Sequence, residues 1–264
     1  ADERENETLK KELIGVYTIW LRDIKRYFRD KPRIIGSFAQ PILFLFVLGT
    51  GIASSFSVFG GGDGRDFLNF MFPGIVGMTV LFTSFFSAMS IVWDREFGFL
   101  KEILVTPISR TSIVIGKLLG GSTIAMIQGT IILLFGPLLK IPITFAIFFK
   151  VIGIMFLVAM TIATIGIVLA SVIKSMQAFQ VITNFLLMPM FFLSGALFPL
   201  NNTLKWMNVV SKANPLSYGI DAMRTVILNN PALQLYPLWL DIVVLASVTV
   251  VLSLLGAFLF SRQE

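Results

Sequence analysis

Six long apolar stretches, separated by polar segments, constrain the fold of this chain more than any other feature. Each is close to the roughly 20 residues that a helix needs to cross the hydrocarbon core of a bilayer. Hydrophobic residues make up 56% of the sequence, which is too large a share for these stretches to be buried in the core of a soluble domain. We therefore expect six transmembrane helices: Ile34–Phe56, Leu68–Val92, Ser112–Leu138, Ile147–Ile173, Ala178–Phe198 and Leu238–Phe260.

The distribution of positive charge predicts how these helices are oriented. Six spans place both ends of the chain on one side of the membrane. Polar segments on that side hold fifteen of the 21 lysines and arginines, and those on the other side hold six. Because such an excess marks the cytoplasmic side, we expect a multi-pass protein of the plasma (cytoplasmic or inner) membrane with both termini in the cytoplasm. The net charge of +6 then reflects topology and not nucleic-acid binding.

Residues 1–33 form an N-terminal region in which apolar and basic residues share a helical period. This pattern predicts an amphipathic helix on the inner membrane surface, ending near Pro32. A contact with a cytoplasmic partner is a second role that the pattern leaves open. Residues 34–264 form the transmembrane domain. The apolar positions of the amphipathic helix are Leu9, Leu13, Val16, Tyr17, Trp20, Leu21, Ile24 and Phe28.

The stretch Trp93–Ser112 separates two apolar spans and carries six charges, three of each sign, over a length that no turn requires. A helix over about residues 93–106 fits its spacing, with Pro107 at the end. This helix either docks on a soluble partner or rests its apolar face on lipid headgroups, and the pattern favours neither. The apolar face holds Phe97, Leu100, Ile103 and Leu104.

The chain lacks residues for catalysis or for driving transport alone. It has no cysteine and no histidine, which excludes thiolate and imidazole metal sites, disulfides and histidine acid–base chemistry. Its Gly-Lys pair, Gly116 and Lys117, precedes a leucine in an apolar run and makes no phosphate-binding loop. The middle of every predicted span lacks Asp and Glu, which argues against an ion-coupled carrier or a charged channel filter. We expect a non-enzymatic subunit that receives energy from another protein.

The segment Pro199–Pro237 is too polar for a span and too apolar for a solvated loop. Two short helices fit it, Thr203–Val210 and a second from the Asn-Pro pair at 214–215 to Leu228. Asp221 and Arg224 are three residues apart and can pair on one helical face. Irregular backbone at membrane depth is tolerated only against protein or a wet cavity, so this segment should border or cap a transport route.

Two stretches resemble the type-2 permeases of ATP-binding-cassette transporters. The sequence "REFGFLKEILVTPISRTSIVIGKLL" is similar to the cytoplasmic segment of that family, and "FLSGALFPLNNTLKWMNVVSKANPLSYGIDAMR" resembles its C-terminal signature. The resemblance extends over the whole chain, and the branch of drug exporters typified by the daunorubicin-resistance membrane subunit is the most similar. The signature positions are Ser194, Gly195, Pro199, Pro215, Leu216, Tyr218 and Arg224.

The resemblance implies two permease subunits, most simply a homodimer, each bound to a nucleotide-binding ATPase that carries ATP and Mg²⁺. The permease itself would hold no cofactor or metal. The helix over residues 93–106 would couple it to the ATPase, and the N-terminal helix would add a second contact. The coupling residues would be Arg95, Glu96, Phe97, Leu100, Lys101 and Glu102, and the external gate would comprise Pro215, Tyr218, Asp221 and Arg224.

Cargo would pass between the two permeases along their first, second and fifth spans. Phenylalanine and methionine are frequent there and suit hydrophobic or amphipathic, drug- or lipid-like cargo, although for any single residue a lipid-facing or packing role is the more common explanation. Three alternatives stay open: export of a lipid-linked glycan or polysaccharide, an ion-coupled secondary carrier, and a membrane scaffold. The pathway candidates are Gln40, Phe44, Phe85, Asn184 and Met188, of which the two amides need a polar partner inside a span.

The expected architecture is therefore an all-α membrane protein. It combines six transmembrane helices with an N-terminal amphipathic interfacial helix, a cytoplasmic coupling helix, and short re-entrant external helices between spans 5 and 6, at about residues 199–237.

Overall fold

The computed structural model describes residues 2–58, 64–97, 109–200 and 203–261, and within these ranges the chain is helical and contains no strand. In chain order the elements are α1 (Asp2–Arg29), α2 (Lys31–Leu43), the π-helix η1 (Phe44–Gly49), α3 (Thr50–Val58), α4 (Gly64–Ser87), α5 (Met89–Glu96), α7 (Arg110–Leu133), the 3-10 helix η2 (Pro137–Leu139), α8 (Phe145–Val172), α9 (Met176–Phe192), α10 (Lys205–Ala213), α11 (Pro215–Leu228), the 3-10 helix η4 (Pro231–Leu233) and α12 (Leu238–Ser261).

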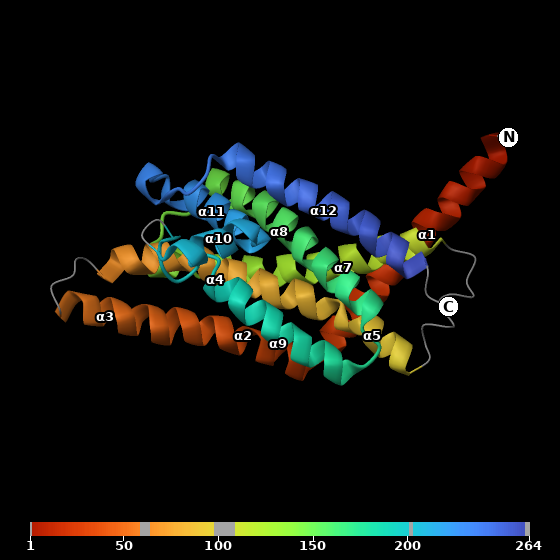
Figure 1. Ribbon diagram of the computed structural model, residues 1–264, viewed down its shortest axis with the longest axis horizontal. Helices are drawn as coiled ribbons and strands as arrows, with labels where there is room; N and C mark the ends of the chain where they lie inside the picture. The colour runs from red at the N-terminus through yellow and green to blue at the C-terminus, as the bar shows by residue number, and fades with distance from the viewer. Residues whose placement is uncertain (1, 59–63, 98–108, 201–202, 262–264) are drawn as a thin grey trace.

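The long helices run side by side in one bundle (Figure 1). The short helices α10 and α11 lie at one end, which we call the outer end. Helix α1 projects from the opposite end, where α12 also finishes. The first and last helices therefore reach the same end of the bundle, as the even number of predicted spans requires.

Five helical runs are long and apolar enough to cross a membrane, and they coincide with five of the six predicted spans. The exception is the predicted span Ala178–Phe198, which is helical only within α9, an apolar helix of 17 residues. At 1.5 Å per residue α9 measures about 26 Å, against a hydrocarbon core of about 30 Å. The chain leaves this helix through a turn at Gly195, whose φ of +78° favours glycine. The count of six spans therefore stays a prediction.

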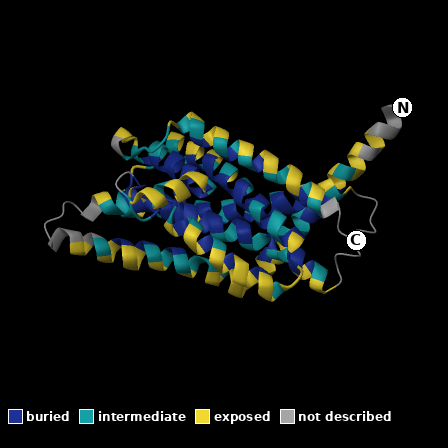
Figure 2. Cartoon of the chain, viewed as in Figure 1, coloured by how far each residue is buried: buried dark blue, intermediate teal, exposed yellow. Residues whose placement is uncertain are grey.

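Helices α4, α7 and α8 form the centre of the bundle, whereas the runs at its two sides are mostly exposed (Figure 2). In the helical run Asp66–Glu96, 67% of the most apolar 18-residue stretch is buried. The corresponding share is 17% in both Lys31–Ile52 and Leu238–Leu259. A Cβ atom on Gly74 of α4 would lie 2.5 Å from the carbonyl oxygen of Ala196, so the turn after α9 packs directly on the α4 backbone. The outer two runs are left to contact lipid or another subunit.

The N-terminal helix packs against the bundle with its second half only. Ile19 is buried and faces Gly116 of α7, and the indole Nε1 of Trp20 donates to the Thr123 hydroxyl at 3.0 Å. In the first half, the apolar residues Leu9 and Leu13 are exposed, and this part extends away from the bundle (Figure 1). The helix ends at Arg29, and Asp30 caps α2. Pro32, which we expected to end α1, lies in the first turn of α2.

Of the two outer helices, α11 has the predicted bounds and α10 differs from them by a few residues. Helix α11 has its N-cap at Asn214 and its C-cap at Asn229, as the Asn-Pro signal and the following Asn-Asn-Pro indicate. Helix α10 begins at Lys205, two residues after the predicted start, and continues to Ala213, three residues beyond the predicted end. Whether these helices re-enter the membrane stays a prediction.

Candidate functional site

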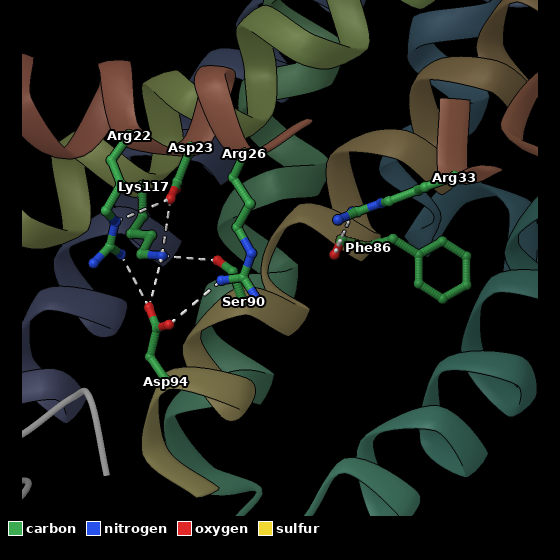
Figure 3. Close-up of polar contacts among 8 residues, drawn as sticks. All are labelled: Arg22, Asp23, Arg26, Arg33, Phe86, Ser90, Asp94 and Lys117. Carbon is green, nitrogen blue, oxygen red and sulfur yellow. Dashed lines mark hydrogen bonds and ion pairs between the residues drawn. The ribbon is translucent and has the colours of Figure 1, made fainter. Parts of the chain in front are cut away.

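Five charged side chains meet where α1, α5 and α7 converge, and we call them the charge cluster: Arg22, Asp23, Arg26, Asp94 and Lys117 (Figure 3). Lys117 is only 5% exposed. Its ammonium group contacts Asp23 at 3.2 Å, Asp94 at 3.1 Å and the Ser90 hydroxyl at 2.8 Å. All three ammonium donors therefore have an acceptor, which is the condition for keeping a lysine buried.

Asp94 is the acceptor that joins the three helices. Besides Lys117 it contacts Arg22 at 3.0 Å and Arg26 at 3.5 Å, both from α1. The carboxylate belongs to α5, the helix that leads into residues 98–108. Any movement of α5 therefore acts on α1 through charge-assisted bonds. The sequence analysis considered Lys117 only as part of a Gly-Lys pair and did not select it as a site residue. A lysine inside an apolar run nevertheless indicates that it needs a buried partner.

The first predicted coupling residues contact the turn between α8 and α9. Arg95 donates to the carbonyl oxygens of Ile173 at 2.8 Å and Ser171 at 3.4 Å, at the C-terminal end of α8. Glu96 accepts the backbone N–H of Met176, the first residue of α9, at 3.0 Å. Phe97 is exposed and lies on the Trp93 ring with centroids 4.7 Å apart. Leu100, Lys101 and Glu102 lie outside the described residues, and the predicted coupling helix stays a prediction there.

Ser109, the first described residue after 98–108, is joined to α1. Glu12 accepts from the backbone N–H of Ser109 at 2.9 Å and from its hydroxyl at 2.8 Å. Hydrogen bonds from the hydroxyls of Ser112 and Ser109 hold the pKa of Glu12 below its ordinary value. Ser109 in turn caps α7, accepting from the Ser112 backbone N–H. The described residues on both sides of 98–108 are thus bound to other helices, through Asp94, Arg95 and Glu96 before the segment and Ser109 after it.

A cavity of about 640 Å³ lies beside the charge cluster, between α1, α2, α4, α5, α7 and α9. Gln128 is 1% exposed and organises one wall of this cavity. Its amide nitrogen donates to the Ser37 hydroxyl at 2.7 Å and to the Tyr27 hydroxyl, and its carbonyl oxygen accepts from Thr83. The uncharged polar lining residues are Tyr27, Ser37, Gln40, Thr79, Thr83, Ser90, Gln128 and Gln180.

Of the predicted pathway residues, the structure brings only Gln40 to this cavity. Phe85 is fully buried and stacks on Phe179. Phe44 packs edge-on against Phe191, and Asn184 and Met188 lie exposed on α9. The reasoning that singled out Gln40 as a polar group inside a span applies equally to Gln128, which the sequence analysis did not select.

At the outer end, the predicted pair of Asp221 and Arg224 does not form, because each side chain binds backbone groups. Arg224 is 2% exposed, donates to the carbonyl oxygens of Gly195 at 2.7 Å and Phe70 at 3.3 Å, and lies 3.8 Å above the Phe70 ring. Burial lowers its pKa to about 10, so the guanidinium stays charged at neutral pH. Asp221 accepts the backbone N–H groups of Leu235 and Tyr236 at 3.0 and 2.9 Å.

The other two predicted gate residues belong to the same packed unit. Pro215 opens α11 after the cap residue Asn214, whose amide also donates to the Met190 carbonyl at 2.7 Å. Tyr218 donates to the Lys212 carbonyl at 2.7 Å, and its ring stacks on Tyr236 with centroids 5.1 Å apart. These contacts tie the turn after α9, both short helices and the start of α12 into one assembly.

Asp241, in the first turn of α12, is fully buried, and neither of its carboxylate oxygens has a hydrogen-bond partner among the described residues. A buried carboxylate costs more free energy than a buried amide of the same shape. We therefore expect Asp241→Asn to stabilise the protein by about 1–3 kcal/mol. Thermal unfolding in detergent measures this, with the exposed Asp66→Asn as control. A lower melting temperature for Asp241→Asn would mean that the carboxylate is stabilised in place.

Comparison with known proteins places these features in a family. The family model described as "ABC-2 type transporter" matches residues 15–228. The putative transport permease ycf38 of Cyanophora paradoxa is 32% identical over 208 residues, covering 76% of this chain and 71% of that protein. Nodulation protein J of Rhizobium meliloti (strain 1021) is 27% identical over 200 residues, covering 75% of each chain. The probable multidrug ABC transporter permease YbhR of Escherichia coli (strain K12) is 26% identical, covering 69% of this chain and 50% of that protein.

These matches confirm the resemblance to type-2 permeases but do not single out the daunorubicin branch. They also agree with the absence of catalytic residues, since the relatives are transport permeases. The charge cluster, the cavity beside it and the packed outer helices all lie within or next to the matched residues. The chain therefore belongs to the ABC-2 type transporter family and is a membrane permease subunit of a transporter.

Proposed function

We propose that this permease is the membrane half of an ATP-driven exporter and that a separate nucleotide-binding ATPase, carrying ATP and Mg²⁺, docks on residues 98–108. The observation that carries the proposal is that the described residues on both sides of this segment bind helices that border the cavity. Before the segment, Asp94 binds α1 and Glu96 binds the first residue of α9. After it, Ser109 binds Glu12 of α1.

These contacts give a force applied at residues 98–108 two routes to the cavity. One runs from Asp94 and Ser109 to α1, which joins α2 through the single residue Asp30. The other runs from Glu96 to the start of α9, next to the bond from Arg95 to the end of α8. Because α2 and α9 both contribute lining residues, their movement would change the shape of the cavity. The permease would thus convert cytoplasmic motion into opening and closing of a transport route.

We further propose that two permeases assemble side by side, most simply as a homodimer, with the route between them. The exposed apolar residues of α2 and α9 support this arrangement, because Ile35 is 73% exposed and Phe185 is 80% exposed. The strong charge bias supports cytoplasmic termini in a plasma (inner) membrane. With the cavity at the cytoplasmic end, cargo enters there and leaves past α10 and α11.

The cavity suits cargo with an apolar part and a polar head, such as a drug- or lipid-like amphiphile. Phe82, Phe86 and Met89 offer apolar contacts, and the hydroxyl and amide groups around Gln128 offer hydrogen bonds. The same polar groups favour a second candidate cargo, a lipid-linked glycan, which requires a hydrophilic path. Both cargoes share a lipid-like tail and a head able to accept or donate hydrogen bonds.

Changing the surface of the proposed docking segment should release the ATPase. In Leu100→Asp combined with Glu102→Lys, an apolar contact is lost and a charge is reversed, so we expect the partner ATPase no longer to co-purify in detergent. The control is Lys205→Glu, an exposed charge reversal on α10 at the outer end. A complex that survives the double substitution, or that is lost in the control, would contradict docking at this segment.

A further inference from the structure

The charged residues that line the cavity all come from one short stretch of chain, and we call this part of the lining the mouth of the cavity. They are Arg26, Asp30 and Arg33, at the junction of α1 and α2, and the other lining residues are uncharged. In Figure 3, Arg26 lies within the charge cluster, and Arg33 lies to one side of it next to Phe86. The two guanidinium groups and one carboxylate give the mouth of the cavity a net positive charge of one.

Two of these three charges already have partners. Arg26 contacts Asp94 at 3.5 Å, and its guanidinium lies 5.7 Å from the centre of the Trp93 ring. The Asp30 carboxylate caps α2 by accepting the backbone N–H of Arg33 at 3.3 Å. Arg26 and Asp30 therefore already have a charged or capping partner, which an additional ion would have to share.

Arg33 differs from both of its neighbours. Within the part of the chain that the structure describes, its guanidinium makes one hydrogen bond, to the Phe86 carbonyl at 3.4 Å, which is long for a charged donor (Figure 3). A guanidinium has five N–H donors in a planar fork that matches carboxylate and phosphate oxygens. Most of the hydrogen-bonding capacity of Arg33 is therefore available at the mouth of the cavity.

The cavity also reaches the surface between α2 and α9. Two of its lining residues, Gly36 and Gln180, are exposed on these helices. A Cβ atom on Gly36 would meet nothing within 4 Å, so the wall is open at this point. A ligand whose head occupies the cavity could leave an apolar tail in the bilayer through this side, since 640 Å³ holds a head group and a few carbons but not a long chain.

We propose that Arg33 binds the anionic head group, a phosphate or carboxylate, of an amphiphile that enters the cavity from the cytoplasmic leaflet. This assignment rests on the proposed function and names the chemical class of its cargo. A cation would meet an unmatched guanidinium and no free carboxylate at the mouth. A neutral head would take Arg33 from water without a charged partner. An anion is opposite in sign to the net charge of the mouth, and its oxygens can accept hydrogen bonds from the planar Arg33 guanidinium.

Binding of matched amphiphiles to the purified full-length chain in phosphatidylcholine nanodiscs tests the proposal. The probes are dodecyl phosphate, dodecyltrimethylammonium and dodecyl maltoside, which share one tail, and inorganic phosphate, which has none. Trp93 lines the cavity and reports binding through its fluorescence, and Trp93→Phe identifies that signal. We expect saturable binding of dodecyl phosphate only. Equal binding of the cationic probe, or of inorganic phosphate alone, would overturn the proposal.

Arg33→Gln should weaken dodecyl phosphate binding about tenfold or more, since a charge-assisted bond contributes about 1.5–3 kcal/mol. Arg29→Gln is the matched control, because Arg29 is exposed on the same stretch and does not line the cavity. Gly36→Leu should also weaken binding by narrowing the open wall, whereas Gly51→Leu, at a second glycine with open space, should not. Equal effects of Arg33→Gln and Arg29→Gln would overturn the assignment.

Co-purification with the ATPase is measured on the same variants and separates the two proposals. If the ATPase binds but the anionic probe does not, the head-group assignment fails and the exporter stands. If the ATPase does not bind any variant or the unmodified chain, the proposed function itself fails.

Discussion

Asp94→Asn is expected to lower the free energy of unfolding by about 3–5 kcal/mol and to abolish export. The substitution preserves shape but removes the charge that Lys117, Arg22 and Arg26 share. Lys117 then stays buried with Asp23 as its remaining carboxylate. Thermal unfolding and ATP-dependent uptake into inverted vesicles measure the two effects, with Asp66→Asn as the control for loss of an exposed carboxylate.

A second variant separates stability from coupling. Combining Asp94→Asn with Lys117→Met removes both the buried carboxylate and the buried ammonium, so part of the lost stability should return. Export should not return, because α5 and α7 no longer hold α1 through these charges. A double variant that exports at the rate of the unmodified protein would show that the cluster serves stability alone.

Arg224→Met is expected to abolish export while leaving the ATPase bound. The change leaves the carbonyl oxygens of Phe70 and Gly195 without their donor, at a cost of about 2–5 kcal/mol, and loosens the turn after α9 from α4 and α11. Arg224→Lys should also fail, since an ammonium cannot reproduce the fork that reaches both carbonyls. Uptake into inverted vesicles and co-purification with the ATPase measure the two properties.

The control for Arg224 is Lys205→Met, which removes an exposed charge from α10 at the same end of the bundle. Its export should match that of the unmodified protein. Because α11, which carries Arg224, lies at the end opposite α1 and α5, the loss of Arg224 should not affect docking (Figure 1). If the ATPase failed to co-purify with Arg224→Met, the placement of α11 away from the cytoplasm would be wrong.

The arrangement of the helices was largely predictable because it depends on local properties of the sequence. Apolar length located five spans, and the Asn-Pro signal located α11 to the residue. The length of α9 was not predictable in this way. Its apolar run continues to Phe198, but the turn at Gly195 packs against α4 at Gly74, which is a tertiary contact.

The candidate site was less predictable because its contacts join residues far apart in the chain. Helical spacing suggested that Asp221 would pair with Arg224, yet backbone groups of Phe70, Gly195 and Leu235 supply better-placed partners. Periodicity likewise marked the charges of residues 93–106 as a surface for a partner. It could not reveal that Arg95 and Glu96 cap α8 and α9, since those ends lie some 75–80 residues along the chain.

The central claim is that motion at residues 98–108 reaches α2 and α9, and distances between spin labels on these helices test it most directly. The chain contains no cysteine, so Ala39→Cys and Gln180→Cys label one exposed position on each helix without further changes. Singly labelled chains identify distances between subunits. In the complex with the ATPase, we predict that ATP shifts the distance between the two labels. Asp94→Asn combined with Glu96→Gln and Glu12→Gln removes the links to α1 and α9 on both sides of residues 98–108, and should abolish the shift while the ATPase stays bound. A shift that persists in this variant, or no shift in the intact complex, would contradict the account.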